Sequence, residues 1–581
     1  MRTYFYISLI VFISFNLKSF GQDNIVSGMP QENIFLHFNS TLLFSGENLY
    51  YKVYCLNNDT KVLSNLSKIA YVEVIGSDNS IIFKQKIRLE NGVGQGDYFV
   101  SANIPSGNYK LVAYTQWMRN GSRNNFFQND LTIINPFQSN QSSLLGKKDS
   151  MNVLAEKYDF EKEIVGTAHQ LSDDGLKIFT NKKSYSKREQ VKVEIKDLNS
   201  NSRKGNYSLS IKKMDTIAKS EMYNTLNYQR LFDGNSWSKD NRIAYLPELR
   251  GELLSGKVMK INDNTPAPNV NVSLSVPGKD FILKIATTNR EGIFYINLEE
   301  NYASKNGVFQ VVNEERKDYK LQLLSTKPYS YMDLEFSDFC ISPSMEKFIL
   351  DRSVENQIAN AYSNTKVDIL DSIPSRTNFS TENAITFVLD DYNRFPSIKE
   401  TIIEIIKPIY VRQRKGMVTI HIKLRDDIID TGILPLVLLD GMLIQNHDEL
   451  LAYSARNIKK IIITKNHIIY GTKKFNGIIE FESFEGDYST IATGDFIKKV
   501  DLFNPLAGKI YFKEDYNNQS KSNRIPDYRN QLLWLPTMDL SSNKKEIIFY
   551  TSDISGYYQI SLEGFSEDGK AVSKRTSFRV D

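Results

Sequence analysis

The sequence predicts a mainly β protein, built as a multi-domain string of β-sandwiches with one α+β domain among them. Short runs that alternate apolar and polar residues recur along the chain, as in residues 71–74 and 191–195. Turn residues such as Pro105 and Gly107 separate the runs at close spacing, which is typical of sandwiches. Aromatic residues, which favour strands, are plentiful, with 32 Tyr and 33 Phe. At ~100–200 residues per domain, this chain of 581 residues has room for roughly three to five domains.

The first 21 residues have the pattern of a secretory signal peptide. Arg2 gives a positive start, residues 4–17 are almost all apolar, and Ser19 and Gly21 are small residues near the expected cleavage point. The apolar run is shorter than the ~20 residues that cross a bilayer as a helix. We therefore expect an exported protein, in the periplasm or associated with the outer membrane.

Charge and cysteine content narrow the class of protein further. The 72 basic and 68 acidic residues give a net charge of +4, which argues against nucleic acid because that partner needs a concentrated basic face. Cys55 and Cys340 are the two cysteines, and both are expected to behave as small buried hydrophobes rather than as a disulfide or a nucleophile.

Residues 22–137 predict the first sandwich. Residues 34–39, 44–52 and 105–111 resemble the opening and the closing hairpin of a macroglobulin-type β-sandwich, an immunoglobulin-like fold. Residues 138–171 are polar and poorly patterned, so we expect a linker there.

Two more segments resemble the same family. Residues 185–195 echo residues 44–54 with one residue inserted, which predicts a second sandwich over 172–245 that includes an irregular connection. The C-terminal residues 498–581 carry Trp534, Leu535 and Pro536, and then Ser552 and Asp553, and predict a further macroglobulin-like sandwich.

Residues 246–330 resemble the small carboxypeptidase-regulatory-like sandwich. Val270, Val272 and Leu274 share one side of a strand, and Gly292 is expected to make the turn that returns Phe294 to the core. Residues 331–395 read as a connecting segment that is partly helical, around 353–364.

Residues 396–485 predict the α+β domain. A helix over 396–407, a buried strand ending near 440, a helix over 448–456 and a strand over 457–465 follow one another. This order and spacing resemble the plug domain of TonB-dependent outer-membrane receptors. About 100 residues follow, too few for a large receptor barrel, so we expect a plug-like domain without its barrel. The combination of modules is similar to envelope proteins of Bacteroidota.

The plug-like motif supplies the candidate partner contacts. They are the residues at its turns: Asp440, Gly441, Tyr470, Gly471, Asn476 and Gly477. The alternative is that these residues only make the turns that the fold requires.

The sequence predicts no enzyme, no cofactor and no metal site. Five histidines are spread along the chain without the spacing of metal ligands on a shared element: His37, His169, His421, His447 and His467. No Gly-x-Ser-x-Gly nucleophile motif or phosphate-binding loop occurs, and neither cysteine lies in a thioester loop.

We therefore expect a non-catalytic binding or scaffold protein of the cell envelope. The plug-like domain suggests an outer-membrane β-barrel transporter or secretion complex as the partner, with this chain peripheral to the membrane. The alternative is a macroglobulin-like protein that binds proteases without a thioester and exposes residues 138–171 to cleavage.

Overall fold

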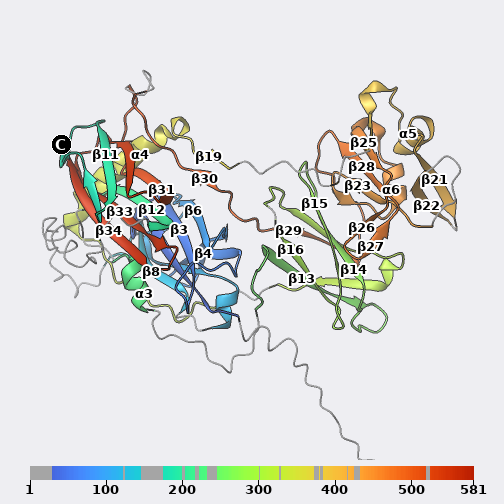
Figure 1. Cartoon of the computed structure of the whole chain (residues 1–581), viewed down its shortest axis with the longest axis horizontal. Helices are drawn as coiled ribbons and strands as arrows, with labels where there is room; N and C mark the ends of the chain where they lie inside the picture. The colour runs from blue at the N-terminus through green and yellow to red at the C-terminus, as the bar shows by residue number, and fades with distance from the viewer. Residues whose placement is uncertain are drawn as a thin grey trace, which may run out of the picture.

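The computed structural model has two bodies joined by several chain segments (Figure 1). The prediction of a mainly β, multi-domain fold is confirmed. The signal peptide, most of the predicted linker and His169 lie outside the described residues. Those residues are 29–121, 125–145, 175–198, 203–215, 217, 221–231, 245–299, 301–325, 329–371, 379, 384–414, 416–423, 432–517 and 524–581.

The first body contains the first sandwich. One of its sheets has the order β1-β3-β6 and the other β2-β8-β7-β4-β5. Apolar side chains of both sheets, among them Leu36, Val53 and Leu111, fill the core between them. The strands are β1 (Glu32–Phe38), β2 (Leu42–Phe44), β3 (Asn48–Asn57), β4 (Ile69–Gly76), β5 (Ile81–Arg88), β6 (Val93–Phe99), β7 (Gly107–Tyr114) and β8 (Phe127–Ile134).

The second sandwich is assembled from two distant parts of the chain. Its sheets have the orders β10-β34-β33-β12-β31 and β32-β11-β9. Leu209 of β12 pairs with Leu562 of β33 on one side and with Leu535 of β31 on the other. The strands are β9 (Leu176–Thr180), β10 (Ser184–Tyr185), β11 (Gln190–Asp197), β12 (Arg203–Lys213), β31 (Gln531–Leu540), β32 (Lys544–Tyr550), β33 (Gly556–Ser566) and β34 (Ala571–Val580).

This assembly corrects the prediction of separate sandwiches over 172–245 and 498–581. Each segment supplies four of the strands, so neither could cover its apolar face without the other. Alternation along a strand shows which face is apolar, but it does not identify the partner strand.

The two sandwiches have the same strand order, position by position. In the first, the Phe44 amide donates to the Glu47 carboxylate at 2.9 Å. In the second, the Ser186 amide donates in the same way to Glu189 at 2.7 Å. The residues before these glutamates, Gly46 and Arg188, both have left-handed backbones. The geometry thus supports the internal repeat, but it places Ser186 opposite Phe44 with equal spacing to the glutamate, so the inserted residue that the sequence suggested is not there.

The repeat shows where the rest of the chain is inserted. In the first sandwich, β4 and β5 are joined by the short turn at residues 77–80. Their counterparts by position in the second sandwich, β12 and β31, are separated by residues 214–530. The second body is therefore built from an insertion in one hairpin of the second sandwich.

The second body begins with an inserted sandwich. Its sheets have the orders β16-β13-β18 and β15-β14-β17-β29. Gly292 has a φ of +72° and Phe294 is fully buried, as the sequence predicted for this turn. The last strand, β29, comes from beyond the α+β domain and was not expected here. The strands are β13 (Glu252–Lys260), β14 (Asn271–Val276), β15 (Ile282–Thr287), β16 (Ile293–Leu298), β17 (Asn306–Val311), β18 (Tyr319–Leu323) and β29 (Ile497–Asp501).

The α+β domain packs against the inserted sandwich, and one continuous core includes Val272 and Phe309 of the sandwich with Ile398 and Ile461 of the α+β domain. The main sheet has the order β20-β25-β28-β23-β24, with β23 and β28 parallel. Its elements are β20 (Ile385–Val388), α5 (Ile398–Glu404), β21 (Ile409–Arg414), β22 (Met417–Ile422), β23 (Leu436–Leu439), β24 (Met442–Leu443), α6 (His447–Leu451), β25 (Ile458–Thr464), β26 (Ile468–Tyr470), β27 (Lys473–Phe475) and β28 (Ile478–Ser483).

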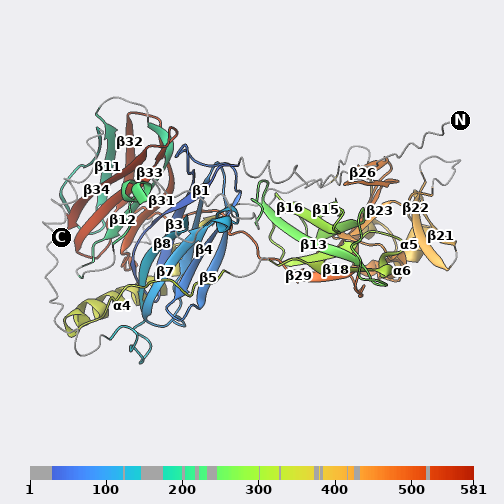
Figure 2. The same ribbon diagram turned by 90° about the horizontal axis from the view of Figure 1, so that it is seen from below.

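The segment between the inserted sandwich and the α+β domain returns to the first body before it leaves again (Figures 1 and 2). On the first body it forms α4 (Glu346–Ala361), close to the helix expected at 353–364. A short ribbon of β19 (Ile369–Leu370) and β30 (Lys509–Ile510) follows. The remaining helix is α3 (Thr225–Leu231). Among the described residues, no helix has the length and apolar character to cross a membrane.

Candidate functional site

The candidate contacts of the plug-like motif lie mainly inside the second body. Gly441 has a φ of +81°, and a Cβ there would lie 2.1 Å from Phe281 of the inserted sandwich. The Tyr470 hydroxyl donates to the carbonyl of Leu283, which belongs to β15 of that sandwich. Gly471 is also left-handed and borders the same strand. These three residues therefore fasten the α+β domain to its neighbour.

The other three candidates make local turns. The buried Asp440 carboxylate accepts from the amide and the hydroxyl of Ser483, at 2.7 and 2.6 Å. Asn476 is buried, and Gly477 is left-handed at a position where a Cβ would lie 2.4 Å from the Thr464 carbonyl. The arrangement agrees with the alternative that these residues make turns required by the fold. Binding of a separate partner by the set stays a prediction, and it would require the two domains to separate.

Helix α4 has an unusual distribution of side chains, and it leads to a different candidate site. A surface helix normally turns apolar residues inward and polar residues outward. The buried residues of α4 are instead polar: Arg352, Ser353 and Asn356. On the other side, Leu350 is 61% exposed and Val354 is 46% exposed.

Buried charge holds α4 to the first sandwich. The Arg352 guanidinium donates from Nε and from one terminal nitrogen to the two oxygens of Glu47, both at 2.8 Å. It also pairs with Asp215 and lies 4.7 Å from the centre of the Phe44 ring. Burial alone would raise the pKa of Glu47, but the charge and hydrogen bonds of Arg352 outweigh it and lower that pKa. Phe348 and Ile349 add partly buried apolar contacts to the same sandwich, so α4 docks through a mixed face with this buried charge at its centre.

Helix α4 also touches the second sandwich. Glu355 pairs with Lys213 of β12 at 3.3 Å and accepts a hydrogen bond from Asn530 beside β31. The helix therefore contacts both sandwiches of the first body.

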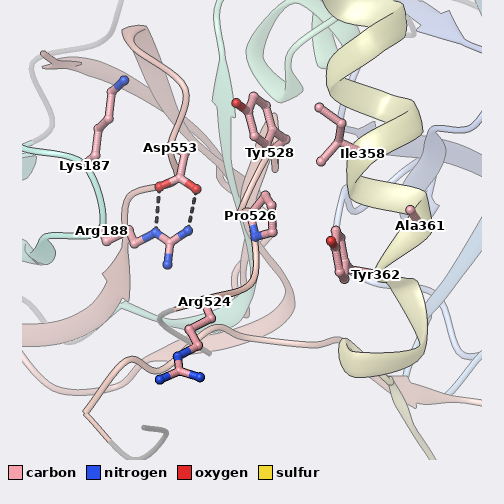
Figure 3. Close-up of a pocket in the computed structure, with 9 residues that line it drawn as sticks. All are labelled: Lys187, Arg188, Ile358, Ala361, Tyr362, Arg524, Pro526, Tyr528 and Asp553. Atoms are coloured by element: carbon pink, nitrogen blue, oxygen red, sulfur yellow. Dashed lines mark hydrogen bonds and ion pairs between the residues drawn. The ribbon is translucent and has the colours of Figure 1, made fainter. Parts of the chain in front are cut away.

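Three apolar residues of α4 form a stripe, the α4 stripe: Leu350 and Val354, which are exposed, and Ile358, which is half-buried. The spacing of four residues places them on one side of the helix. The stripe ends at a cleft between α4 and the second sandwich, where Ile358, Ala361 and Tyr362 form one wall (Figure 3).

The cleft has a volume of about 660 Å³ and a largely basic opposite wall. Arg188 lies there and forms two hydrogen bonds of 2.6 Å with the Asp553 carboxylate (Figure 3). Lys187 and Arg524 are exposed and form no ion pair with a described residue. The complete lining is Lys187, Arg188, Ile358, Ala361, Tyr362, Arg524, Pro526, Tyr528 and Asp553.

A serine–histidine contact elsewhere has no such access. The His37 ring nitrogen Nδ1 lies 2.6 Å from the Ser208 hydroxyl, at the junction of the two sandwiches. Both residues are buried, and burial lowers the pKa of His37 to about 3. Ser208 also accepts a hydrogen bond from Tyr54. The pair is thus part of an interdomain hydrogen-bond network with no approach for a substrate.

The part of the chain that the structure describes also offers no metal-binding group and no disulfide. No group of three or more His, Cys, Asp or Glu side chains there could hold a metal ion. Both cysteines are free; Cys55 is buried as expected, but Cys340 is exposed, which corrects the prediction for that residue.

Sequence reasoning missed the cleft because its walls come from three distant segments, near residues 187, 361 and 525. One signal was available in the sequence. Leu350, Val354 and Ile358 follow one another at helical spacing beside the predicted helix. That spacing alone, however, reads equally well as a buried face.

Comparisons with known proteins identify no family for this chain. No family model matches the sequence, and no curated protein matches it. Among solved structures, the chain is similar to Escherichia coli alpha-2-macroglobulin activated by porcine elastase, with 10% identity, a TM-score of 0.24, and coverage of 95% of this chain and 44% of the other. Salmonella alpha-2-macroglobulin reacted with methylamine gives 9% identity, a TM-score of 0.22 and coverage of 94% and 39%. The chain thus spans about two fifths of the length of these structures, and at such TM-scores the likeness carries no argument about function.

Proposed function

We propose that this protein is a non-catalytic binding protein of the cell envelope, and that helix α4 is its docking element. The observation that carries the proposal is the distribution of side chains on α4, which buries Arg352 and Asn356 while it exposes Leu350 and Val354. Leaving large apolar side chains in water is unfavourable, and fully burying an exposed one contributes roughly 1.5–3 kcal/mol. Because Leu350 and Val354 are about half exposed, covering each of them contributes about half of that. A partner that covers the α4 stripe would supply that stabilisation.

The proposed partner is an outer-membrane β-barrel protein of a transport or secretion complex, as the signal peptide and the plug-like pattern suggest. In this proposal the α+β domain does not dock through its turns, because Gly441 and Tyr470 already contact the inserted sandwich. The first body carries the contact instead.

Affinity purification from gently solubilised membranes tests the proposal. A tagged full-length chain is compared with the double variant Leu350→Ser and Val354→Ser. The matched control is Ile403→Ser, because Ile403 is an apolar residue on α5 that is 55% exposed. We expect a stoichiometric β-barrel partner with the wild type and the control, and its loss with the double variant. Recovery of the wild type as a monomer without such a partner would overturn the proposal.

A second candidate function is protease binding. Its supporting observation is the position of residues 146–174, which separate β8 of the first sandwich from β9 of the second. The flanking residues Leu144 and Leu176 are both buried, so both ends are anchored. Cleavage within this segment followed by retention of the protease on size-exclusion chromatography would favour this function. A protease that cuts there and elutes separately, with full activity, would exclude it.

A further inference from the structure

We propose that the α4 stripe and the cleft together take one acidic amphipathic helix of a partner protein. Its apolar side chains would cover Leu350, Val354 and Ile358, and its carboxylates would face Lys187 and Arg524. This inference rests on the proposed function and goes further, because it states the chemistry of the segment that docks.

The charge of the cleft selects an acidic segment. Its lining contains three cationic side chains and one carboxylate. That carboxylate, Asp553, is already held by Arg188 through two hydrogen bonds. Arg188 also donates to the Ile525 carbonyl at 2.7 Å, so its guanidinium is largely satisfied. Lys187 and Arg524 remain exposed, without an ion pair to any residue that the structure describes. Complementary carboxylates on a partner would compensate these two charges.

The apolar wall selects a helix. Leu350, Val354 and Ile358 repeat every four residues, which presents a ridge along α4. From Leu350 to Ala361 the ridge is roughly 16 Å long, or about three helical turns. A partner helix with apolar residues three and four apart fits such a ridge side by side, in the manner of helix-in-groove recognition.

The shape of the site disfavours a flat membrane surface, although apolar and basic side chains together also suit anionic lipid. The basic residues and Tyr362 lie on opposite walls of a concave cleft, with Pro526 between them in the view of Figure 3. A planar surface that touched Leu350 would not fill the space between those walls. A protruding segment of a protein would.

Site-specific photo-crosslinking in the intact protein tests the inference. The photoreactive residue p-benzoylphenylalanine replaces Val354 in the full-length chain in cells, and mass spectrometry reads the sequence of the trapped segment. The same residue at Ile403 is the control for non-specific trapping. We expect a trapped segment with helical apolar spacing and a net negative charge within about ten residues of the cross-link.

Charge reversal provides the second readout. Lys187→Glu with Arg524→Glu removes two pairs, each worth about a 1.4- to 5-fold change in binding, and should reduce the cross-linking yield roughly 2- to 30-fold. High salt should reduce the yield of the wild type more than that of the variant, because exposed pairs are screened.

The outcomes separate this inference from the proposed function. A neutral or basic protein segment, or a yield that charge reversal leaves unchanged, overturns the acidic helix while the binding function stands. A trapped phospholipid overturns it in favour of membrane binding. If no specific cross-linked product forms at Val354, both the acidic-helix inference and the proposed binding function are overturned.

Discussion

Replacing Arg352 with methionine should release α4 from the first sandwich. The side chains of Arg352 and Asp215 are 4% and 5% exposed, and that of Glu47 is 11% exposed. Methionine keeps much of the aliphatic volume but leaves two buried carboxylates without their cation. Removing one partner of a buried ion pair costs ~3–5 kcal/mol. At the lower figure, the equilibrium constant for opening of the helix should rise by at least about 100-fold.

Hydrogen–deuterium exchange measures this opening directly. The measurement follows the peptides that span residues 346–361. It reports the local opening of α4 and does not depend on the global stability of this multi-domain chain. Lys347→Met is the matched control, because Lys347 forms an exposed pair with Asp351 on the same helix at 3.2 Å. Such a surface pair contributes about 0–1 kcal/mol, so exchange should change by less than about five-fold. Equal exchange in the two variants would refute the argument that buried charge holds α4.

Three further predictions concern other parts of the molecule. Burial raises the pKa of Glu248 to about 8, so between pH ~4.5 and ~8 this carboxyl binds more protons in the folded protein than in the unfolded chain, and its contribution to stability falls as pH rises. Urea unfolding at both ends of this window should show a larger loss of stability with pH for the wild type than for Glu248→Gln, and equal losses would contradict the shift. Gly441→Ala should lower the melting temperature of the second body more than Gly486→Ala, because both glycines are left-handed but only Gly441 abuts Phe281; equal shifts would contradict the contact. A fluorophosphonate probe, which reacts with activated serines, should leave Ser208 unlabelled in the native protein because this serine is buried. Labelling of Ser208 would instead support an enzymatic function.

The sequence predicted strands well where the pattern is local. Gly292 and Phe294 lie as expected, since a left-handed glycine and an alternating apolar strand are properties of a few neighbouring residues. The helices near 353 and 398 were also found, with altered ends. At Ser397 the helix begins with a side-chain cap, in which the Ser397 hydroxyl accepts from the Glu400 amide.

Long-range assembly was not predictable in the same way. The pairing of Leu209 with both Leu535 and Leu562 joins segments more than three hundred residues apart, and no local pattern encodes such a partner. The turn at Asp440 illustrates the same limit. Its residues were correctly read as turn formers, but the neighbour that covers Gly441 is Phe281, far away in the sequence.

The position of α4 follows from the same insertion that misled the domain prediction. Because the chain leaves the second sandwich in the middle of a hairpin, it must come back to that hairpin, and α4 lies on one of its returns to the first body (Figure 2). There Arg352 binds the Glu47 turn of the first sandwich, while the helix ends beside Arg188, at the equivalent turn of the second. In that turn Lys187 takes the position that Ser45 has in the first sandwich, and it is one of the two cations without an ion pair to a described residue. A position with a buried serine in the first repeat carries an exposed lysine in the second, and that lysine belongs to the proposed docking site. Because the turn is formed without it, Lys187→Glu is the most direct single variant for separating a binding role from a purely structural one.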